Sequence, residues 1–265
     1  MIEALILGIV QGLTEFIPVS SSGHLVLFHE LFGFQEGGLA FDVALHMGTL
    51  LAVVLYFRKD LMELARGFFA GNQKQRNMVW LLAVATIPAV IVGLSLQSVV
   101  ESVLRSPWVV AAMLVLFGLF MIVAEIKAES IKHKRKTDKL TGRQAVSIGL
   151  LQACALIPGV SRSGATISGG LLLGLDRVAA TRFSFLLAIP IIFGAGAKVL
   201  LEEAARNDVA AHLTMFASGT TAAFISGMIA IRFLLAFVAR YSIRSFAYYR
   251  FVAAGLIILL LVLQR

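Results

Sequence analysis

The stretch QGLTEFIPVSSSGH, residues 11 to 24, places a carboxylate, a histidine and three consecutive hydroxyls inside an otherwise hydrocarbon-like sequence. In a helix, Gln11 and Glu15 lie one turn apart on the same face. Pro18, which has no backbone N–H, ends that helix soon afterwards. The serines that follow are typical N-cap residues of a second helix, whose free N–H groups and positive dipole end attract an anion. The stretch therefore predicts two helices joined by a polar turn that can hold an anion.

The composition predicts an integral membrane protein. Of the 265 residues, 59% are hydrophobic and 14% are charged, and the mean hydropathy is +0.90. This leaves too little polar surface for a soluble globule of this size. Long apolar runs near the ~20 residues that cross a bilayer recur, without the alternation of a β-barrel. The basic N-terminal region of a signal peptide is absent, so we expect no cleavage. A single cysteine, Cys154, excludes an internal disulfide and a cysteine-based metal cluster.

Eight apolar segments predict an all-α, polytopic fold in a single membrane domain, residues 1–265. Pro, Ser and Gly interrupt the first and fifth segments near their middles, and a membrane tolerates irregular backbone only where it is buried in protein or lines a polar cavity. We therefore expect two re-entrant helical hairpins and about six transmembrane helices. The segments run roughly over residues 4–28, 41–57, 78–99, 107–126, 144–173, 183–201, 214–238 and 246–263.

The two halves of the chain, roughly residues 1–126 and 143–265, resemble each other. An ungapped offset of 141 residues pairs Ser20 with Ser161 (161 − 20 = 141) and aligns QGLTEFIPVSSSG with the stretch around PGVSRSGAT. Offsets of 142 and 134 align further apolar residues downstream. Three full crossings in each half, an odd number, would insert the second half upside down. Inverted repeats with two broken helices that meet at the bilayer midplane are typical of transporters.

The positions of Lys and Arg predict the orientation. The loops on one side hold only Arg105 and Arg206 among these residues, whereas the other side has most of them. The positive-inside rule puts the basic side in the cytoplasm, where the central loop 127–142 would also contact anionic lipid head groups. Topology explains the net charge of +8, so we expect no nucleic-acid partner. The basic loops are residues 58–77, 127–143, 174–182 and 239–245.

The second break adds Arg162, a permanently charged donor fork that suits phosphate or carboxylate. An arginine at membrane depth costs ~2.5 to 3.5 kcal/mol on insertion scales, so it marks a functional site. Thr166 lies one helical turn away. A structural pairing of Arg162 with Glu15 across the twofold relation stays open as the alternative.

Taken together, these residues match a phosphoryl-transfer site with a hydroxyl nucleophile, a base, a positive clamp and an acid that can hold a hard cation. Clustered histidines and carboxylates are too few for a zinc or two-metal site. One Mg²⁺ or Ca²⁺ shared with substrate phosphates fits better. Arg250, about a turn inside the last segment, is a second candidate clamp or an interface residue. Asp42 and His46, one turn apart, are expected to support or to pack.

These residues resemble a known family, the bacterial undecaprenyl-pyrophosphate phosphatases associated with bacitracin resistance. That family is similar in having an acid or Gln, three residues, then Glu, followed by serines and a histidine, and later P-G-x-S-R-S-x-x-T. The resemblance covers essentially the whole chain, including FAYYRF near its end. The matching positions are Gln11, Glu15, Ser20, Ser21, Ser22, His24, Pro158, Gly159, Ser161, Arg162, Ser163 and Thr166.

The resemblance implies hydrolysis of undecaprenyl pyrophosphate, a polyprenyl pyrophosphate lipid, to the monophosphate and inorganic phosphate, which recycles the lipid carrier of peptidoglycan synthesis. It also implies Mg²⁺ or Ca²⁺ and a site in the bacterial cytoplasmic (inner) membrane that opens to the periplasmic side. Glu15 with Gln11 would hold the cation or a proton, Ser21 would be the nucleophile and His24 its base. The expected phosphate ligands are Ser20, Ser22, Ser161, Arg162, Ser163, Thr166 and Arg250.

Two alternatives stay open. Water could attack directly with His24 as the base, and a transporter or flippase of a phosphorylated lipid could use the same anion site. Against transport alone, Glu15, Ser21 and His24 lie opposite Leu156, Arg162 and Ala165 in the second half, and a carrier needs only anion receptors. The oligomeric state is not determined, and a homo-oligomer stays open.

Overall fold

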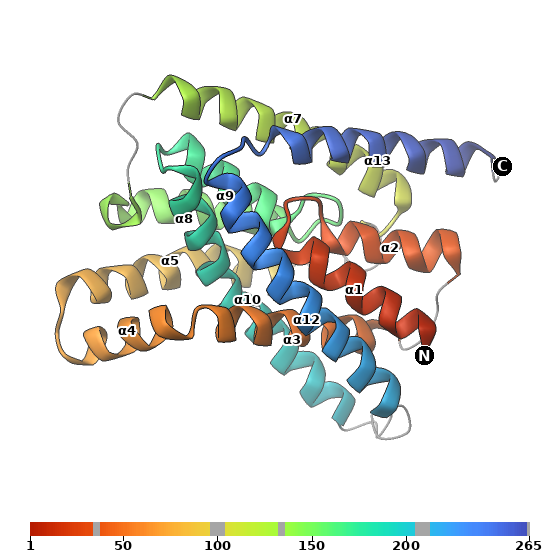
Figure 1. Cartoon of the computed structure of the whole chain (residues 1–265), viewed down its shortest axis with the longest axis horizontal. Helices are drawn as coiled ribbons and strands as arrows, with labels where there is room; N and C mark the ends of the chain where they lie inside the picture. Colours follow the sequence, from red (N-terminus) through yellow and green to blue (C-terminus); the bar gives the residue numbers. More distant parts are fainter. Residues whose placement is uncertain (34–37, 96–103, 132–135, 205–212, 264–265) are drawn as a thin grey trace.

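The computed structural model describes residues 1–33, 38–95, 104–131, 136–204 and 213–263, and the ordered elements in this part of the chain are helices (Figure 1). They are α1 (Ile2–Phe16), α2 (Ser21–Phe32), α3 (Gly38–Tyr56), α4 (Arg58–Phe69), α5 (Gln73–Ser95), α7 (Pro107–Ser130), the 3₁₀ helix η1 (Thr137–Lys139), α8 (Gly142–Cys154), α9 (Arg162–Leu172), α10 (Arg177–Ala204), α12 (Leu213–Val238) and α13 (Arg244–Leu263).

Five of these helices, α5, α7, α10, α12 and α13, are long and apolar enough to cross a membrane. The pair α3 and α4, bent by 70° at Phe57, is a sixth candidate. The expectation of an all-helical protein with about six crossings is therefore confirmed. Both termini lie at the right-hand end of Figure 1, as an even number of crossings requires.

Two helical pairs, α1 with α2 and α8 with α9, form hairpins, because the two helices of each pair pack against each other. The four helices have only 15, 12, 13 and 11 residues. At a rise of ~1.5 Å per residue, none of them can cross the ~30 Å hydrocarbon core. Each hairpin must therefore turn back inside the protein, as the interrupted segments predict.

The packing has the pattern that a twofold relation between the two halves produces. Helices that match each other in the sequence alignment face each other, namely α3 with α10 and α7 with α13. Each hairpin packs against a helix of the opposite half, α1 against α12 and α8 against α5. The halves thus interlock around the hairpins.

Two glycines separated by the repeat offset, Gly8 and Gly149, allow the close approach of the hairpins to these partner helices. A Cβ at Gly8 would come within 2.8 Å of the Ala222 Cβ, and a Cβ at Gly149 would overlap the Ala85 carbonyl oxygen. Real Cβ atoms essentially never approach so closely. The same requirement for glycine therefore occurs at both crossings.

The first hairpin tip rests on an aromatic core. Phe16 packs edge-on against Phe185 of α10, with ring centroids 5.2 Å apart, and Phe185 packs in the same way against Phe57, at 6.2 Å. All three side chains are fully buried. Because Phe16 follows Glu15 directly, this core fixes the end of α1 that carries the acid.

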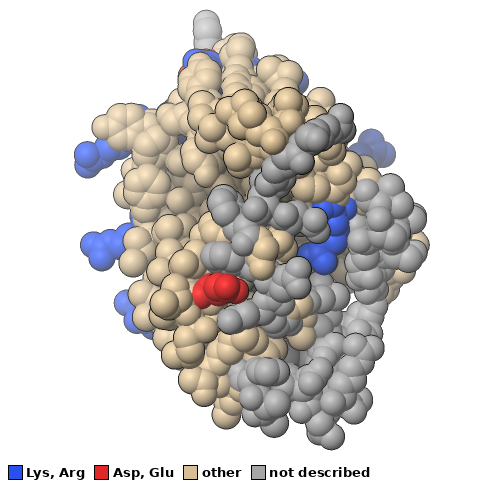
Figure 2. Space-filling view, turned by 90° about the vertical axis from the view of Figure 1, so that its right-hand side faces the viewer, with Lys and Arg blue, Asp and Glu red and all other residues tan. Residues whose placement is uncertain are grey.

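The right-hand end of the molecule in Figure 1 is poor in charged side chains. Figure 2 looks onto the right-hand end of Figure 1, where few of the described residues in view are charged. At this end Arg105 contacts Asp42, with 3.4 Å between Nη2 and Oδ2, whereas Arg206 lies outside the described residues. The turn between α4 and α5 lies at the opposite end.

Candidate active site

The two hairpin tips share one unusual backbone conformation. Ser20 has φ 77° and ψ 91°, and Ser161 has φ 72° and ψ 113°. They are the only non-glycine residues with positive φ in the described part of the chain. Each serine caps the helix that follows it, Ser20 Oγ accepting from Gly23 N at 3.3 Å and Ser161 Oγ from Gly164 N at 3.1 Å. Such conformations cost of order 1–3 kcal/mol and persist only where the surroundings fix them.

Hydrogen bonds between the hairpins provide this fixation. Ser20 Oγ also accepts from the backbone N–H of Gly159 in the second tip, at 3.1 Å. Ser163 Oγ lies 3.2 Å from Ser161 Oγ and donates to the carbonyl of Ile17 in the first tip, at 3.3 Å. Two of the predicted phosphate ligands, Ser20 and Ser163, therefore join the tips to each other.

Arg250 of α13 fastens both tips to α7. Its side chain is fully buried, and all three guanidinium nitrogens donate to main-chain carbonyls. These belong to Pro18 in the first tip, to Gly159 and Val160 in the second, and to Met113 and Leu114 in α7. The structure does not bring Arg250 to the cavity described below, so phosphate binding by Arg250 stays a prediction.

A cavity of about 220 Å³ lies between the tips. It brings together five of the predicted residues, Glu15, Ser21, Ser22, Ser161 and Arg162. Apolar side chains from α3, α5 and α10 and from the end of the second hairpin complete the wall, including Val43, Ala89, Leu156, Ile191, Ile192 and Ala195.

Glu15 is the centre of the polar contacts in this cavity. Its side chain is 5% exposed. Oε2 accepts from Ser21 Oγ at 2.6 Å and from Gln11 Nε2 at 3.1 Å, and Oε1 accepts from Arg162 Nη2 at 3.1 Å. The carboxylate therefore contacts a hydroxyl that it can deprotonate, while an arginine balances its charge.

Arg162 forms the ion pair that the sequence left open as an alternative. Besides the bond to Glu15, Nη1 donates to the Ser184 carbonyl at 3.0 Å. Its Nε is buried and has no hydrogen-bond partner among the described residues. The guanidinium thus pairs with the acid and keeps one N–H without a hydrogen-bond partner among the described residues.

His46 of α3 also lines the cavity, although the sequence analysis gave it only a supporting role. Its Nδ1 lies 2.7 Å from the Asp42 carbonyl oxygen. A carbonyl only accepts, so Nδ1 carries the proton and Nε2 faces Glu15 Oε2, 3.7 Å away. The sequence showed that Asp42 and His46 share a face, but no signal placed α3 beside α1.

Gln152 of α8 is a second cavity residue that sequence reasoning missed. Its side chain is buried, at 3% exposure, and neither its Oε1 nor its Nε2 has a hydrogen-bond partner in the described residues. A buried amide without partners is costly. The repeat alignment contained a usable signal, because Gln152 is the counterpart of Gln11 (152 − 11 = 141).

The remaining predicted residues lie around the cavity rather than in its wall. His24 Nδ1 lies 2.7 Å from the Ser20 carbonyl oxygen, and its Nε2 lies 2.7 Å from the Tyr249 hydroxyl. Both ring nitrogens are therefore occupied, and the role of His24 as a base stays a prediction. Thr166 Oγ1 donates to the Arg162 carbonyl at 2.8 Å and lies 2.6 Å from Ser184 Oγ, which braces the turn that carries Arg162.

The described residues contain no group of three or more His, Cys, Asp or Glu side chains that could hold a metal ion. Glu15 and Gln152 both line the cavity, and the buried Gln152 Oε1 has no hydrogen-bond partner among the described residues. Gln11 Oε1 is also unpartnered, but Gln11 does not line the cavity. Hard cations prefer such oxygen donors, and Mg²⁺ commonly completes its shell with water and substrate phosphates. The donors therefore fit a cation shared with a bound phosphate.

Comparison with the sequences of known proteins shows the family of this chain. A protein of Rubrobacter xylanophilus named undecaprenyl-diphosphatase is 47% identical over 99% of both chains. Proteins of the same name from Corynebacterium glutamicum and Desulforudis audaxviator are each 45% identical, over 98% and 99% of this chain and 90% and 98% of their own. Residues 4–256 match the family described as bacitracin resistance protein BacA. The chain belongs to the bacitracin resistance protein BacA family.

Proposed function

We propose that this protein hydrolyses undecaprenyl diphosphate to undecaprenyl phosphate and inorganic phosphate. This reaction recycles the lipid carrier of cell-wall synthesis and gives resistance to bacitracin. The observation that carries the proposal is the contact of one carboxylate, Glu15, with both a hydroxyl, Ser21, and a cation, Arg162, inside an apolar-walled cavity. The relatives named undecaprenyl-diphosphatase, which match nearly the whole chain, supply the substrate.

The position of the cavity suits a lipid substrate. Withdrawing an isoprenoid tail from the bilayer costs ~0.8 kcal/mol per buried CH₂, so a polar site must come to the lipid. The hairpins bring polar helix starts to the middle of the bundle, and Leu156, Ile191 and Ile192 of the cavity wall offer apolar surface to the first isoprene units.

The terminal phosphate would lie against Arg162, with the free Nε–H as one donor and the starts of α2 and α9 nearby. Ser21 Oγ would then attack the terminal phosphorus while its proton passes to Glu15 Oε2, 2.6 Å away. The new Oγ–P bond forms as the bond to the bridging oxygen breaks, and undecaprenyl phosphate leaves with that electron pair. Water then gives a proton to Glu15 as its oxygen bonds to phosphorus and the Oγ–P bond breaks. Inorganic phosphate leaves, and Ser21 Oγ regains a proton.

His46 would accept the proton that Glu15 receives. Its Nε2 faces Glu15 Oε2 at 3.7 Å, and the Nδ1–H bond to the Asp42 carbonyl orients the ring. This exchange would return Glu15 to its charged form before water attacks. The proposed base is therefore Glu15, assisted by His46, because it contacts the serine directly.

We also propose one Mg²⁺ or Ca²⁺ in the site. Glu15 and the Gln152 amide oxygen would hold it, and the ion would supply positive charge to the phosphate oxygens. The other contributions come from the chain itself: Arg162 orients the phosphate, Glu15 holds the proton and the apolar wall excludes bulk water.

We place the protein in the bacterial cytoplasmic membrane, with the cavity open to the periplasmic side. Two features support this placement. The cavity takes Val43 and His46 from the first half of α3 and Ala195 from the second half of α10. These parts of the helices lie towards the end opposite the basic loops, which the positive-inside rule assigns to the cytoplasm.

The test is release of inorganic phosphate from undecaprenyl diphosphate by the purified protein in detergent, with Mg²⁺ or Ca²⁺ added and then removed by chelation. Acid quenching with substrate labelled at the terminal phosphate should trap label on Ser21, and Ser21→Ala should lose both label and turnover. Ser147→Ala, on the exposed face of α8 and outside the cavity wall, is the matched control. Failure to release phosphate from bound lipid would reject the function, whereas turnover by Ser21→Ala would assign the attack to water.

A further inference from the structure

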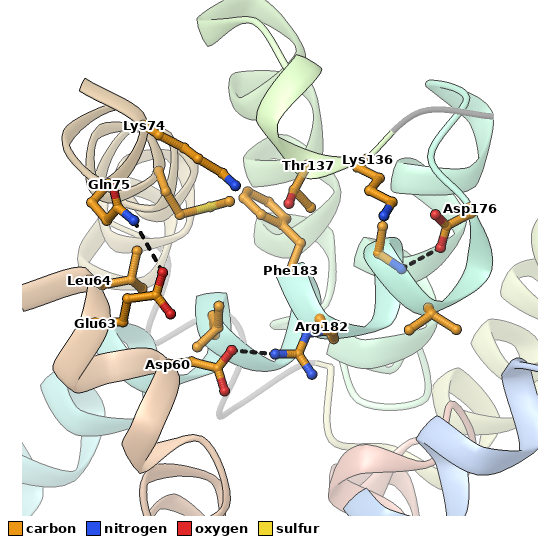
Figure 3. Close-up of a pocket in the computed structure, with 14 residues that line it drawn as sticks. Asp60, Glu63, Leu64, Lys74, Gln75, Lys136, Thr137, Asp176, Arg182 and Phe183 are labelled. Atoms are coloured by element: carbon orange, nitrogen blue, oxygen red, sulfur yellow. Dashed lines mark hydrogen bonds and ion pairs between the residues drawn. The ribbon is translucent and has the colours of Figure 1, made fainter. Parts of the chain in front are cut away.

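A second cavity, of about 590 Å³, lies among α4, α5, η1 and the first turns of α10 (Figure 3). It shares no lining residue with the cavity around Glu15. Both cavities lie along α10, which contributes Arg182, Phe183 and Leu186 to this one and Ile191, Ile192 and Ala195 to the other. The second cavity is therefore a separate site at the basic end of the molecule.

The carboxylates that line this cavity already have donors. Asp60 pairs with Arg182, which also lies over the Phe57 ring at 5.1 Å. Glu63 accepts from Gln75 Nε2 at 3.2 Å, and Asp176 accepts from the backbone N–H of Ala179 at 2.7 Å, capping α10. The three acids and Arg182 therefore already have partners within the protein.

Two lysines in the wall have no acidic partner among the described residues. Lys74 comes from the first turn of α5 and Lys136 from the residue before η1. Figure 3 shows both side chains reaching toward the space between these elements from different sides. They can therefore approach one anion together, whereas the engaged acids offer little to a cation.

Apolar side chains complete the wall between the lysines, namely Leu64, Met78, Val178, Ala179, Phe183 and Leu186. The helix α4 contains both charged and apolar residues, has no buried residue and leaves α3 at 70°. These are properties of a helix that lies in a membrane interface. An anion with an adjoining apolar part, located at head-group level, matches this combination.

We propose that this cavity binds the phosphate group of an anionic membrane lipid. Lys74 and Lys136 contact the phosphate, and the apolar side chains contact the glycerol and the first methylenes. This lipid site is separate from the cavity around Glu15, because no residue lines both cavities.

Native mass spectrometry of delipidated protein with phosphatidylglycerol or phosphatidylcholine tests the site, with inorganic phosphate as a competitor. Removing both lysines, Lys74→Gln with Lys136→Gln, should raise the apparent Kd for phosphatidylglycerol about ten-fold or more. The reason is that each lysine near an anionic head group strengthens the binding of that lipid. The matched control is Lys59→Gln with Lys139→Gln, which removes the same charge from α4 and η1 outside the cavity wall. This control should change the Kd less than about two-fold.

Three results would overturn the site: equal effects of the two double variants, equal affinity of the wild type for the two lipids, or no recovery by Lys74→Arg with Lys136→Arg. Inorganic phosphate that competes with phosphatidylglycerol for the wild type, but not for Lys74→Gln with Lys136→Gln, would support the same site. The site would then bind phosphate from solution as well as the phosphate of a lipid. Release of phosphate from undecaprenyl diphosphate, in detergent without added phospholipid, should be unchanged by these variants. Failure of this site and failure of the hydrolase proposal therefore give different results.

Discussion

The two hairpin tips have the same backbone but different chemistry. Ser20 and Ser161 adopt the same strained conformation and cap their helices in the same way. The first tip supplies the acid and the hydroxyl, Glu15 and Ser21, and the second supplies the cation, Arg162, at the position equivalent to Ser21 (162 − 21 = 141). The same backbone thus begins a helix in each tip, while the side chains at the two helix starts differ in their chemistry.

The pair Gln11 and Gln152 shows how the same residue has different surroundings in the two hairpins. Gln11 Nε2 donates to Glu15, one turn along α1. In the second hairpin the equivalent of Glu15 is Leu156 (156 − 15 = 141), so Gln152 lacks this acceptor, and its amide has no hydrogen-bond partner in the part of the chain that the structure describes. The same residue is a support in one hairpin and an open polar group in the other.

The largest expected effect comes from removing the acid of the first tip. Glu15→Gln should reduce kcat for phosphate release about 10²- to 10⁴-fold, because the amide cannot accept the Ser21 proton. Glu3→Gln, in the first turn of the same helix, is the control and should keep normal turnover. Substantial turnover by Glu15→Gln would remove Glu15 from the chemistry and leave it as the partner of Arg162.

Replacing the planar guanidinium of Arg162 in the second tip should have the next largest effect. Arg162→Lys keeps the charge but loses the free Nε–H, so we expect kcat/KM to fall about 10- to 100-fold. Steady-state phosphate release over a range of lipid concentrations measures this, with Arg143→Lys at the start of α8 as the control. If Arg162→Lys matched the wild type, charge alone would account for the second tip.

His46 and His24 offer a sharper comparison within the first half. His46→Gln can still bond to the Asp42 carbonyl but cannot accept a proton, so kcat for phosphate release should fall about ten-fold. His24→Gln should lower kcat by less than this, because both His24 nitrogens are already hydrogen-bonded. The opposite result would restore His24 as the base.

The smallest effect is expected at Gln152. Gln152→Ala removes an amide that only substrate or cation would use, so kcat/KM should fall about three- to ten-fold, with a higher Mg²⁺ or Ca²⁺ concentration needed for half-maximal rate. The melting temperature should not fall, because the Gln152 amide makes no hydrogen bond to another described residue. A destabilised protein with unchanged metal dependence would assign Gln152 to packing.

The sequence predicted the membrane fold well because the evidence is local. Apolar runs report their own length, prolines and serines mark their own breaks, and the repeat offset compares two stretches directly. The five cavity residues Glu15, Ser21, Ser22, Ser161 and Arg162 were predicted for the same reason, since each belongs to one of the two breaks.

Roles that depend on distant neighbours were not visible in the sequence. Arg250 is a candidate phosphate clamp or interface residue on the sequence alone, and its observed partners are carbonyls, which carry no side-chain signature. His46 looked like a supporting residue, because its contact with Glu15 joins two helices whose approach depends on a third, α12, which packs on both.

The sequence by itself thus determined the number of crossings, the two breaks and the chemical groups at their tips, because hydrophobic length and helix capping are properties of contiguous residues. Only the tertiary structure decided which polar groups face the cavity and which bind the tips together. That division depends on how closely the hairpins pack against helices of the opposite half, at Gly8 and Gly149, and on where the carbonyls of both tips converge on Arg250.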